Sequence, residues 1–155
     1  MSGVKSQFQR TICDCNGCSS HCRIKPGFLI PSDIQAIEEF CEHRIDETPV
    51  FRLSSKTRVM IGNIVMPLIT ITPNVKDDGS CIFLNDEGKC DIHPVSPFGC
   101  SHFDGHMSFV ESEKRLRAGV NEVLHDLMNY GPYCERVANM ELDCHPVVEI
   151  RFVNQ

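Results

Sequence analysis

The first stretch with a helical pattern of hydrophobic and polar positions begins near Ser32. The run Ser32-Asp33-Ile34-Gln35 has the form of a capping box, in which side chains bond the free amides of the first helical turn. Apolar side chains recur at helical spacing after it, at Ile34, Ile37, Phe40 and Cys41. Acidic side chains occupy the other side, at Glu38, Glu39 and Glu42. The pattern therefore predicts an amphipathic helix, with Cys41 as a small hydrophobic residue of its buried face.

A second helix is predicted over residues 109–129. Ser108 and Glu111 offer another capping box, and Gly131 followed by Pro132 is a typical end signal. One apolar stripe runs between these signals, formed by Leu116, Val120, Val123, Leu124, Leu127 and Met128. Spacing of this kind predicts one face packed on a core.

Strands are predicted where β-branched residues gather. Residues 50–75 are rich in Val, Ile and Thr, and Pro67 among them indicates a sheet edge or a bulge. Residues 81–92 are predicted to form a hairpin around the turn residues 85–88, with Cys81 and Cys90 close together on neighbouring strands. Residues 147–153 could add a final strand. The predicted fold is a small α+β domain with much irregular chain and a cysteine-ligated metal core.

Composition narrows the class of protein. A length of 155 residues suits one domain, and a net charge of −6 argues against nucleic acid as a partner. Residues 1–11 hold no apolar signal segment, and the longest apolar run, 64–69, is too short to cross a bilayer. We therefore expect a cytoplasmic protein that is not membrane-bound. Thiols stay reduced there, so metal binding is favoured over a disulfide framework, although secretion by another route would revive that alternative.

Cysteines carry the clearest chemical signal. The chain has ten, and six of them form two clusters with metal-ligand spacing: Cys15, Cys18 and Cys22, then Cys81, Cys90 and Cys100. Thiolates bind zinc and iron–sulfur clusters, and close spacing lets one loop supply several ligands.

These cysteines and their surroundings resemble the CxxCxxCC family of zinc- or iron-chelating domains, the YkgJ-like cysteine-cluster proteins. The naming motif corresponds to Cys15-x-x-Cys18-x-x-His21-Cys22, with His21 in place of one cysteine. The helix start Pro31-Ser32-Asp33-Ile34, the stretch from Cys81 to His93 and the run from Ser96 to Phe103 follow in the family's order. Ser96 and Ser101 stand where the family has arginines. The resemblance covers residues 13–104 and implies a single cysteine-cluster metal-binding domain, with a leader over 1–12 and a C-terminal helix and strand over 105–155.

Several ligand sets are compatible with this spacing. Cys15, Cys18 and Cys22 could form a three-thiolate loop, completed by Cys81, Cys90 or Cys100; alternatively, the last three could hold a second centre. Adjacent side chains diverge, so His21 and Cys22 are not expected to bind one ion together. Further candidates, each weaker than these six, are His21, Cys134, Cys144 and Cys13.

Three functions are compatible with such a centre. The first is an iron–sulfur protein, with a [4Fe–4S] cluster as the expected form, that carries electrons to a redox partner or assists another enzyme. The second is a zinc-stapled module that binds a protein partner without catalysis. The third is an iron enzyme, because Cys100, His102, Asp104 and His106 would share one face if that stretch were extended. A polar loop is the competing interpretation of the stretch, and whether the protein is an enzyme stays open.

Overall fold

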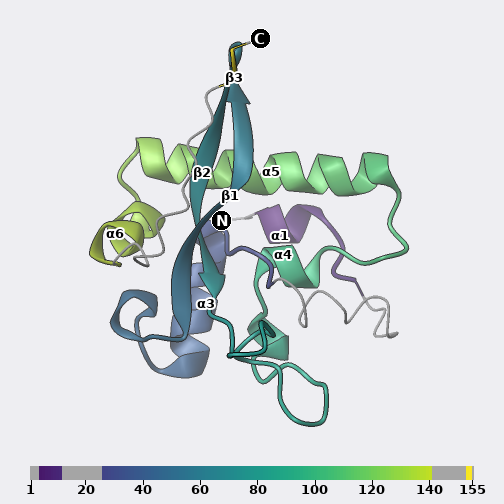
Figure 1. The fold of residues 1–155 in the computed structure, drawn as a ribbon, viewed down its shortest axis with the longest axis vertical. Coiled ribbons are helices and arrows are strands. Elements are labelled where there is room, and N and C mark those ends of the chain that lie inside the picture. Colours follow the sequence, from purple (N-terminus) through teal and green to yellow (C-terminus); the bar gives the residue numbers. More distant parts are fainter. Residues whose placement is uncertain (1–3, 12–25, 141–152, 155) are drawn as a thin grey trace.

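The computed structural model describes residues 4–11, 26–140 and 153–154. They form a small single domain with mixed helix and strand content, shown in Figure 1. The helices are α1 (Val4–Gln7), α3 (Pro31–Cys41), α4 (Phe98–Ser101), α5 (Phe109–Met128) and α6 (Pro132–Asn139), with short 3₁₀ turns η1 (Ile45–Glu47) and η2 (His93–Val95). The strands are β1 (Phe51–Ile61), β2 (Ile64–Pro73) and β3 (Val153–Asn154).

The sheet is antiparallel, in the order β1-β2-β3, and its main part is the long hairpin of β1 and β2. The two-residue connection contains Gly62 with φ 61°, a conformation that glycine adopts readily. A bulge interrupts the register between Ser54 and Thr57, directly beside the Pro67–Arg58 pair. The prediction of strands over 50–75 with an irregularity near Pro67 is confirmed. One end of the hairpin extends beyond the helices as an arm (Figure 1).

The core lies where α3, α5 and α6 meet the other end of the hairpin. Its fully buried side chains include Leu29, Ile30, Ile37, Ile71, Phe98, Val123 and Tyr133. Helix α5 approaches Phe98 closely, because an added Cβ at Gly119 would lie 2.8 Å from the Phe98 ring. The segment before α3 and the short helix α4 are therefore central parts of the core.

Helix α3 starts differently from the prediction. Its N-cap is Ile30 rather than Ser32, and the Asp33 carboxylate accepts hydrogen bonds from the amides of Ile30 and Phe98, both at 2.9 Å. Lys5 of α1 lies 2.7 Å from the other carboxylate oxygen. Burial raises the pKa of Asp33, an effect that Lys5 opposes. One acidic side chain thus joins α1, α3 and α4.

Helix α5 matches its prediction, and α6 is an addition. Ser108 caps α5 by accepting the Glu111 amide at 3.1 Å. Gly131 and Pro132, expected to end α5, also begin α6. The buried carboxylate of Asp126 in α5 accepts the amide of Cys134 at 2.8 Å and so caps the new helix.

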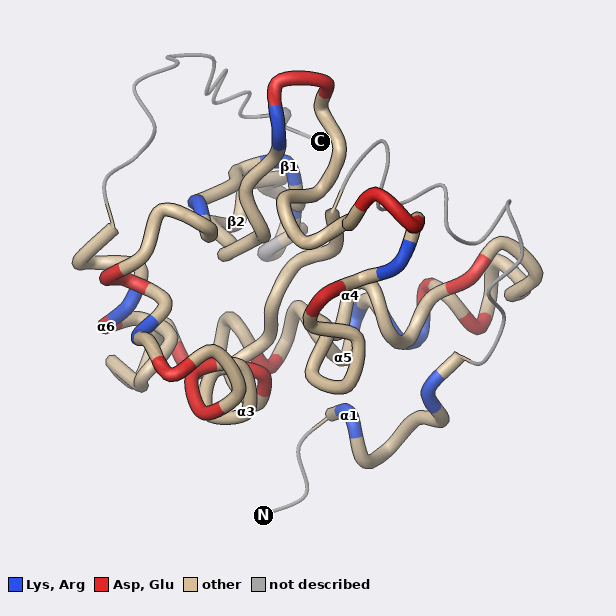
Figure 2. The backbone as a smooth tube through the Cα atoms, turned by 90° about the horizontal axis from the view of Figure 1, so that it is seen from below, with Lys and Arg blue, Asp and Glu red and all other residues tan. Residues whose placement is uncertain are grey.

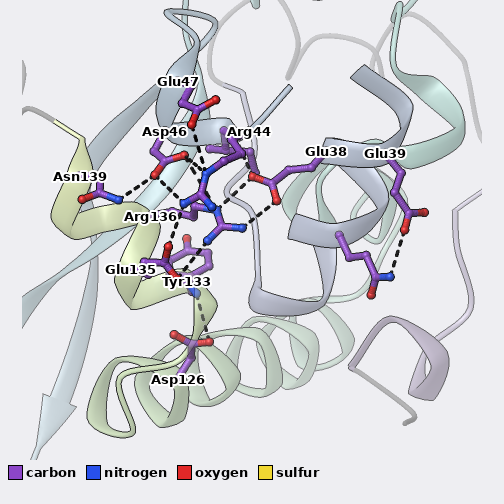
Figure 3. A network of polar contacts seen from close by, with 12 residues as sticks. Glu38, Glu39, Arg44, Asp46, Glu47, Asp126, Tyr133, Glu135, Arg136 and Asn139 are labelled. Carbon is purple, nitrogen blue, oxygen red and sulfur yellow. Dashed lines mark hydrogen bonds and ion pairs between the residues drawn. The ribbon is translucent and has the colours of Figure 1, made fainter. Parts of the chain in front are cut away.

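Charged side chains join α3, η1 and α6, as Figure 3 shows. Arg136 of α6 donates two hydrogen bonds to Glu38 of α3, at 2.9 and 3.0 Å. Arg44 pairs with Asp46 in the same two-bond geometry and with Glu135 at 2.9 Å. The bonds from Arg136 lower the pKa of Glu38, and those from Arg44 lower the pKa of Asp46 to about 2. The network holds α6 against the C-terminal end of α3.

Candidate metal-binding site around Cys100

Cys100 lies in α4, beside the segment that leads into α3. The Gly27 amide donates a hydrogen bond to the Cys100 sulfur at 3.2 Å, and the Gly99 amide donates to the Phe28 carbonyl at 3.0 Å. The two backbones touch here, since a Cβ on Gly27 would lie 2.1 Å from the Gly99 carbonyl carbon. A side chain at either glycine would force the two segments apart. Glycine at both positions thus allows the amide–sulfur contact.

Thr11 contacts the same helix at Ser101. Its amide and its hydroxyl both donate to the Ser101 carbonyl, at 2.9 and 3.1 Å. Thr11 and Gly27 are close in sequence to the two ends of 12–25, the segment that carries the first cysteine cluster. The described fold therefore fixes the chain on both sides of that segment to Cys100 and its neighbour.

Two arginines hold the N-terminal residues in this position. Arg10 donates to the carbonyl of His93 and to the Ser96 hydroxyl, the latter at 2.9 Å. Arg115 of α5 is buried and donates to the carbonyls of Gln9 and His102, at 2.7 and 2.9 Å. Residues 4–11, described from the sequence as a leader, are thus integrated into the domain.

The predicted hairpin of Cys81 and Cys90 is wrong in its details. Cys81 forms an isolated bridge with Val75, and Cys90 forms one with Leu84, so the two cysteines are not cross-strand partners. Residues 81–92 instead form successive turns, because the Cys81 carbonyl accepts the Leu84 amide at 3.0 Å and closes a turn before a strand can develop. Cys81 is buried and Cys90 is partly exposed.

The remaining predicted ligands are dispersed or lie outside the described residues. Cys134 sits in the first turn of α6, where its amide is bonded to Asp126. Cys41 packs partly against the core, as predicted, and burial raises the pKa of its thiol. Cys13, Cys15, Cys18, His21, Cys22 and Cys144 lie outside the described residues.

The stretch from Cys100 to His106 does not form the shared face that an iron enzyme would need. Cys100 is in a helical turn, and His102 is a buried side chain whose ring stacks on Phe98. Both of its ring nitrogens are bonded, to the Ser101 hydroxyl at 2.7 Å and to the Lys5 carbonyl at 3.2 Å. Asp104 accepts the His106 amide at 2.9 Å, which closes a local turn. The alternative of an extended two-histidine, one-carboxylate site is contradicted, because helical and turn hydrogen bonds replace the extended conformation.

Three cations lie near α4, but two of them are paired with acidic side chains. Burial lowers the pKa of His102, and the charges of Lys5, Arg115 and Arg10 act in the same direction. Lys5 is paired with Asp33 at 2.7 Å, and Arg115 with Glu111 at 2.9 Å. Arg10 forms no ion pair within the described residues and would offset part of the charge of thiolates gathered at one centre.

Within residues 4–11, 26–140 and 153–154, no three Cys, His, Asp or Glu side chains converge as a metal site. A complete ligand set would thus need residues from elsewhere in the chain as well as Cys100. Sequence reasoning missed the four residues that flank this site: Thr11, Gly27, Gly99 and Arg115. The turn signal at Pro26-Gly27 and the Gly99-Cys100 pair were visible, but their contact joins distant segments and leaves no local pattern.

Comparisons of the chain with protein-family models, with curated proteins and with solved structures find no match. In the part of the chain that the structure describes, no helix has the length and apolar character needed to span a membrane.

Proposed function

We propose that the protein is a small metalloprotein that binds an iron–sulfur cluster through clustered cysteines. The candidate ligands are Cys15, Cys18, Cys22, Cys81, Cys90 and Cys100, and the proposed form of the cluster is [4Fe–4S]. Such a cluster takes four of them: Cys15, Cys18 and Cys22, with Cys100 as the fourth because the flanks of the first cluster bond to Cys100 and Ser101. Its role is electron transfer to a redox partner or assistance to another enzyme, in the cytoplasm. When bound, such a cluster supplies a one-electron centre whose potential depends on hydrogen bonds to its sulfurs.

The observation that carries the proposal is the anchoring of the chain around Cys100. Thr11 and Gly27 lie on either side of the segment that carries Cys15, Cys18 and Cys22, and they bond the Ser101 carbonyl and the Cys100 sulfur. An extended residue spans at most about 3.6 Å, so Cys15 starts within about 14 Å of Thr11, and Cys22 within about 18 Å of Gly27. Convergence of these thiols with Cys100 therefore needs no rearrangement of the described fold.

The amide–sulfur bond at Cys100 supports the same proposal. Hydrogen bonds to cysteine sulfurs are a recognised means of tuning iron–sulfur centres. Of the nearby cations, Arg10 forms no ion pair within the described residues and would offset part of the charge of the thiolates. Both features suit a ligand cysteine better than a thiol that only fills space.

The test is anaerobic purification followed by assays of iron, zinc and acid-labile sulfide. We expect iron and sulfide in equal amounts, with broad absorbance near roughly 400 nm that bleaches on reduction. Serine substitutions of Cys15, Cys18, Cys22 and Cys100 should each remove most of the iron. A colourless protein that holds neither iron nor sulfide would refute the proposal.

Cys41 provides a matched control, because its thiol packs partly against the core at the end of α3. Cys41→Ala should leave the iron and sulfide content unchanged. If it removes as much iron as Cys100→Ser does, loss of folding rather than loss of a ligand explains both results. Stoichiometric zinc without sulfide would instead assign the cysteines to a zinc-stapled interaction module.

A further inference from the structure

A second candidate site lies on the β1–β2 hairpin, where the sheet faces α4, α5 and the segment before α3. A larger cavity, of about 1200 Å³, lies along α3, but most of its acidic side chains already form hydrogen bonds or ion pairs within the fold. The hairpin cavity is smaller, about 460 Å³, within the range typical of small-molecule sites. Its described lining residues include basic side chains and no acidic ones.

Positive charge is concentrated at this cavity. Lys56 and Arg58 of β1 line it, and none of its described lining residues is acidic. Figure 2 shows basic segments on the hairpin, whose two strands contain no Asp or Glu, while acidic segments follow α3. Both cations are exposed, and within the described residues neither forms an ion pair. Two uncompensated cations at one cavity favour an anionic ligand.

Hydroxyl groups add hydrogen-bonding capacity beside these charges. Thr57, Thr72 and Ser112 line the cavity, and Thr72 is buried. Each of these hydroxyls can donate to or accept from a polar group of a ligand.

The other wall of the cavity is apolar. It is formed by Phe28, Phe103 and Leu116, and Leu116 is 41% exposed although it was predicted to face the core. One end is bounded by Gly27 and Gly99, whose backbones touch without side chains. This wall would accept the organic part of a ligand whose charged group reaches the hairpin.

We propose that this cavity binds a small organic anion, with its phosphate or carboxylate group between Lys56 and Arg58 and its apolar part against Phe103 and Leu116. The two headgroups share the chemistry of planar or tetrahedral oxygen acceptors that lysine and arginine recognise. The proposal does not depend on a metal centre at Cys100.

Isothermal titration calorimetry on the full-length protein tests it, with phenyl phosphate, benzoate, benzyl alcohol and benzylamine as probes. We expect one of the two anions, or both, to bind with 1:1 stoichiometry and a dissociation constant of about 1 mM or below. Benzyl alcohol and benzylamine should bind at least about tenfold more weakly, and added salt should weaken anion binding. The tighter of the two anions identifies the headgroup.

Single variants locate the binding. Lys56→Gln and Arg58→Gln should each raise the dissociation constant about three- to tenfold, and Thr72→Val about threefold. Lys114→Gln is the matched control, because Lys114 is exposed on α5 and does not line the cavity; it should bind as the wild type does. Circular dichroism checks that each variant is folded.

Three results would overturn the proposal. The first is anion binding no tighter than that of benzyl alcohol. The second is unchanged affinity in the Lys56→Gln, Arg58→Gln double variant. The third is inorganic phosphate that binds as tightly as phenyl phosphate at several sites, which would indicate an adventitious ion only.

Discussion

Tyr133 is the residue whose side-chain hydrogen bonds have the clearest expected contribution to the free energy of unfolding. It is fully buried in α6, and its hydroxyl accepts the Ile71 amide at 2.7 Å while donating to the Leu29 carbonyl at 2.8 Å. These two backbone groups belong to β2 and to the segment that leads from Gly27 into α3. One phenol group therefore joins a helix, a strand and the segment beside the candidate metal site.

Tyr133→Phe keeps the ring and deletes both hydrogen bonds. A buried backbone group left without a partner costs about 1–3 kcal/mol, and here one amide and one carbonyl would lose this partner. The direct backbone bond between these residues, at 2.8 Å, joins the Leu29 amide to the Ile71 carbonyl, so it satisfies neither of the two groups that lose the phenol. It does hold those two groups close together, so a small relaxation can pair them in part, and the lower part of the range applies to each. We expect the free energy of unfolding to fall by about 2–4 kcal/mol, a large share of the roughly 5–15 kcal/mol typical of a domain.

Urea denaturation followed by circular dichroism measures this change. At this chain length the melting temperature should fall by roughly 10 °C. Tyr130→Phe is a matched control, because Tyr130 is 86% exposed; its variant should stay within about 0.5 kcal/mol of wild type. If Tyr133→Phe is as stable as Tyr130→Phe, the phenol does not connect these three segments, and the packing of α6 described above is incorrect.

Three further predictions concern the segments around the site and the charged network. Gly27→Ala should lower both stability and iron content, because the new methyl group would overlap the Gly99 backbone. Denaturation and metal analysis of the purified variant check this, and a stable variant with full iron content would contradict it. Lys5→Met should destabilise by about 2–4 kcal/mol while its buried partner, the Asp33 carboxylate, is charged, because that group would lose its counter-charge. The loss should shrink as the pH falls, because burial raises the pKa of Asp33 and the carboxylate gains a proton; a loss in urea denaturation that does not change with pH would refute the charge argument. Asp46→Asn should destabilise the protein at pH 7, because Arg44 holds the pKa of Asp46 at about 2 and the charged carboxylate stabilises the fold. The difference in stability from wild type should shrink as pH falls below 4 and disappear through about pH 2, as the carboxylate is protonated. A difference that persists at pH 2 would contradict this.

The sequence predicts best where structure is decided locally. The long helix α5 and the hairpin of β1 and β2 follow from periodicity, capping and β-branched residues. The predicted stripe of α5 is less accurate at its ends, since Leu116 and Met128 are 41% and 76% exposed while Val123 is fully buried. A stripe defines the face that packs, but the extent of the neighbouring elements decides which residues are covered.

Helix α6 shows what sequence patterns do not contain. Its eight residues would be marginal alone, and its support comes from Asp126 at its start and from Tyr133 in the core. The turn signal at Gly131-Pro132 was recognised, but whether the chain stops or restarts as a helix depends on those tertiary contacts. The hairpin predicted over 81–92 is the converse case, where suitable turn residues produce turns without flanking strands.

The candidate metal site depends both on local sequence patterns and on contacts between distant segments. Cysteine spacing indicates ligands through chemistry that is local to each cluster. The link from the flanks of the first cluster to α4 is made by contacts of Thr11 and Gly27 with Ser101 and Cys100, which no spacing rule could reveal. The electrostatics of that link has a consequence for folding. Several thiolates brought to one centre would repel one another before an ion or cluster binds, and Arg10, which forms no ion pair within the described residues, would reduce that repulsion. Arg10 and Arg115 also hold residues 4–11 in place, so the N-terminal residues would contribute to the stability of the proposed site as well as to its connection with the core.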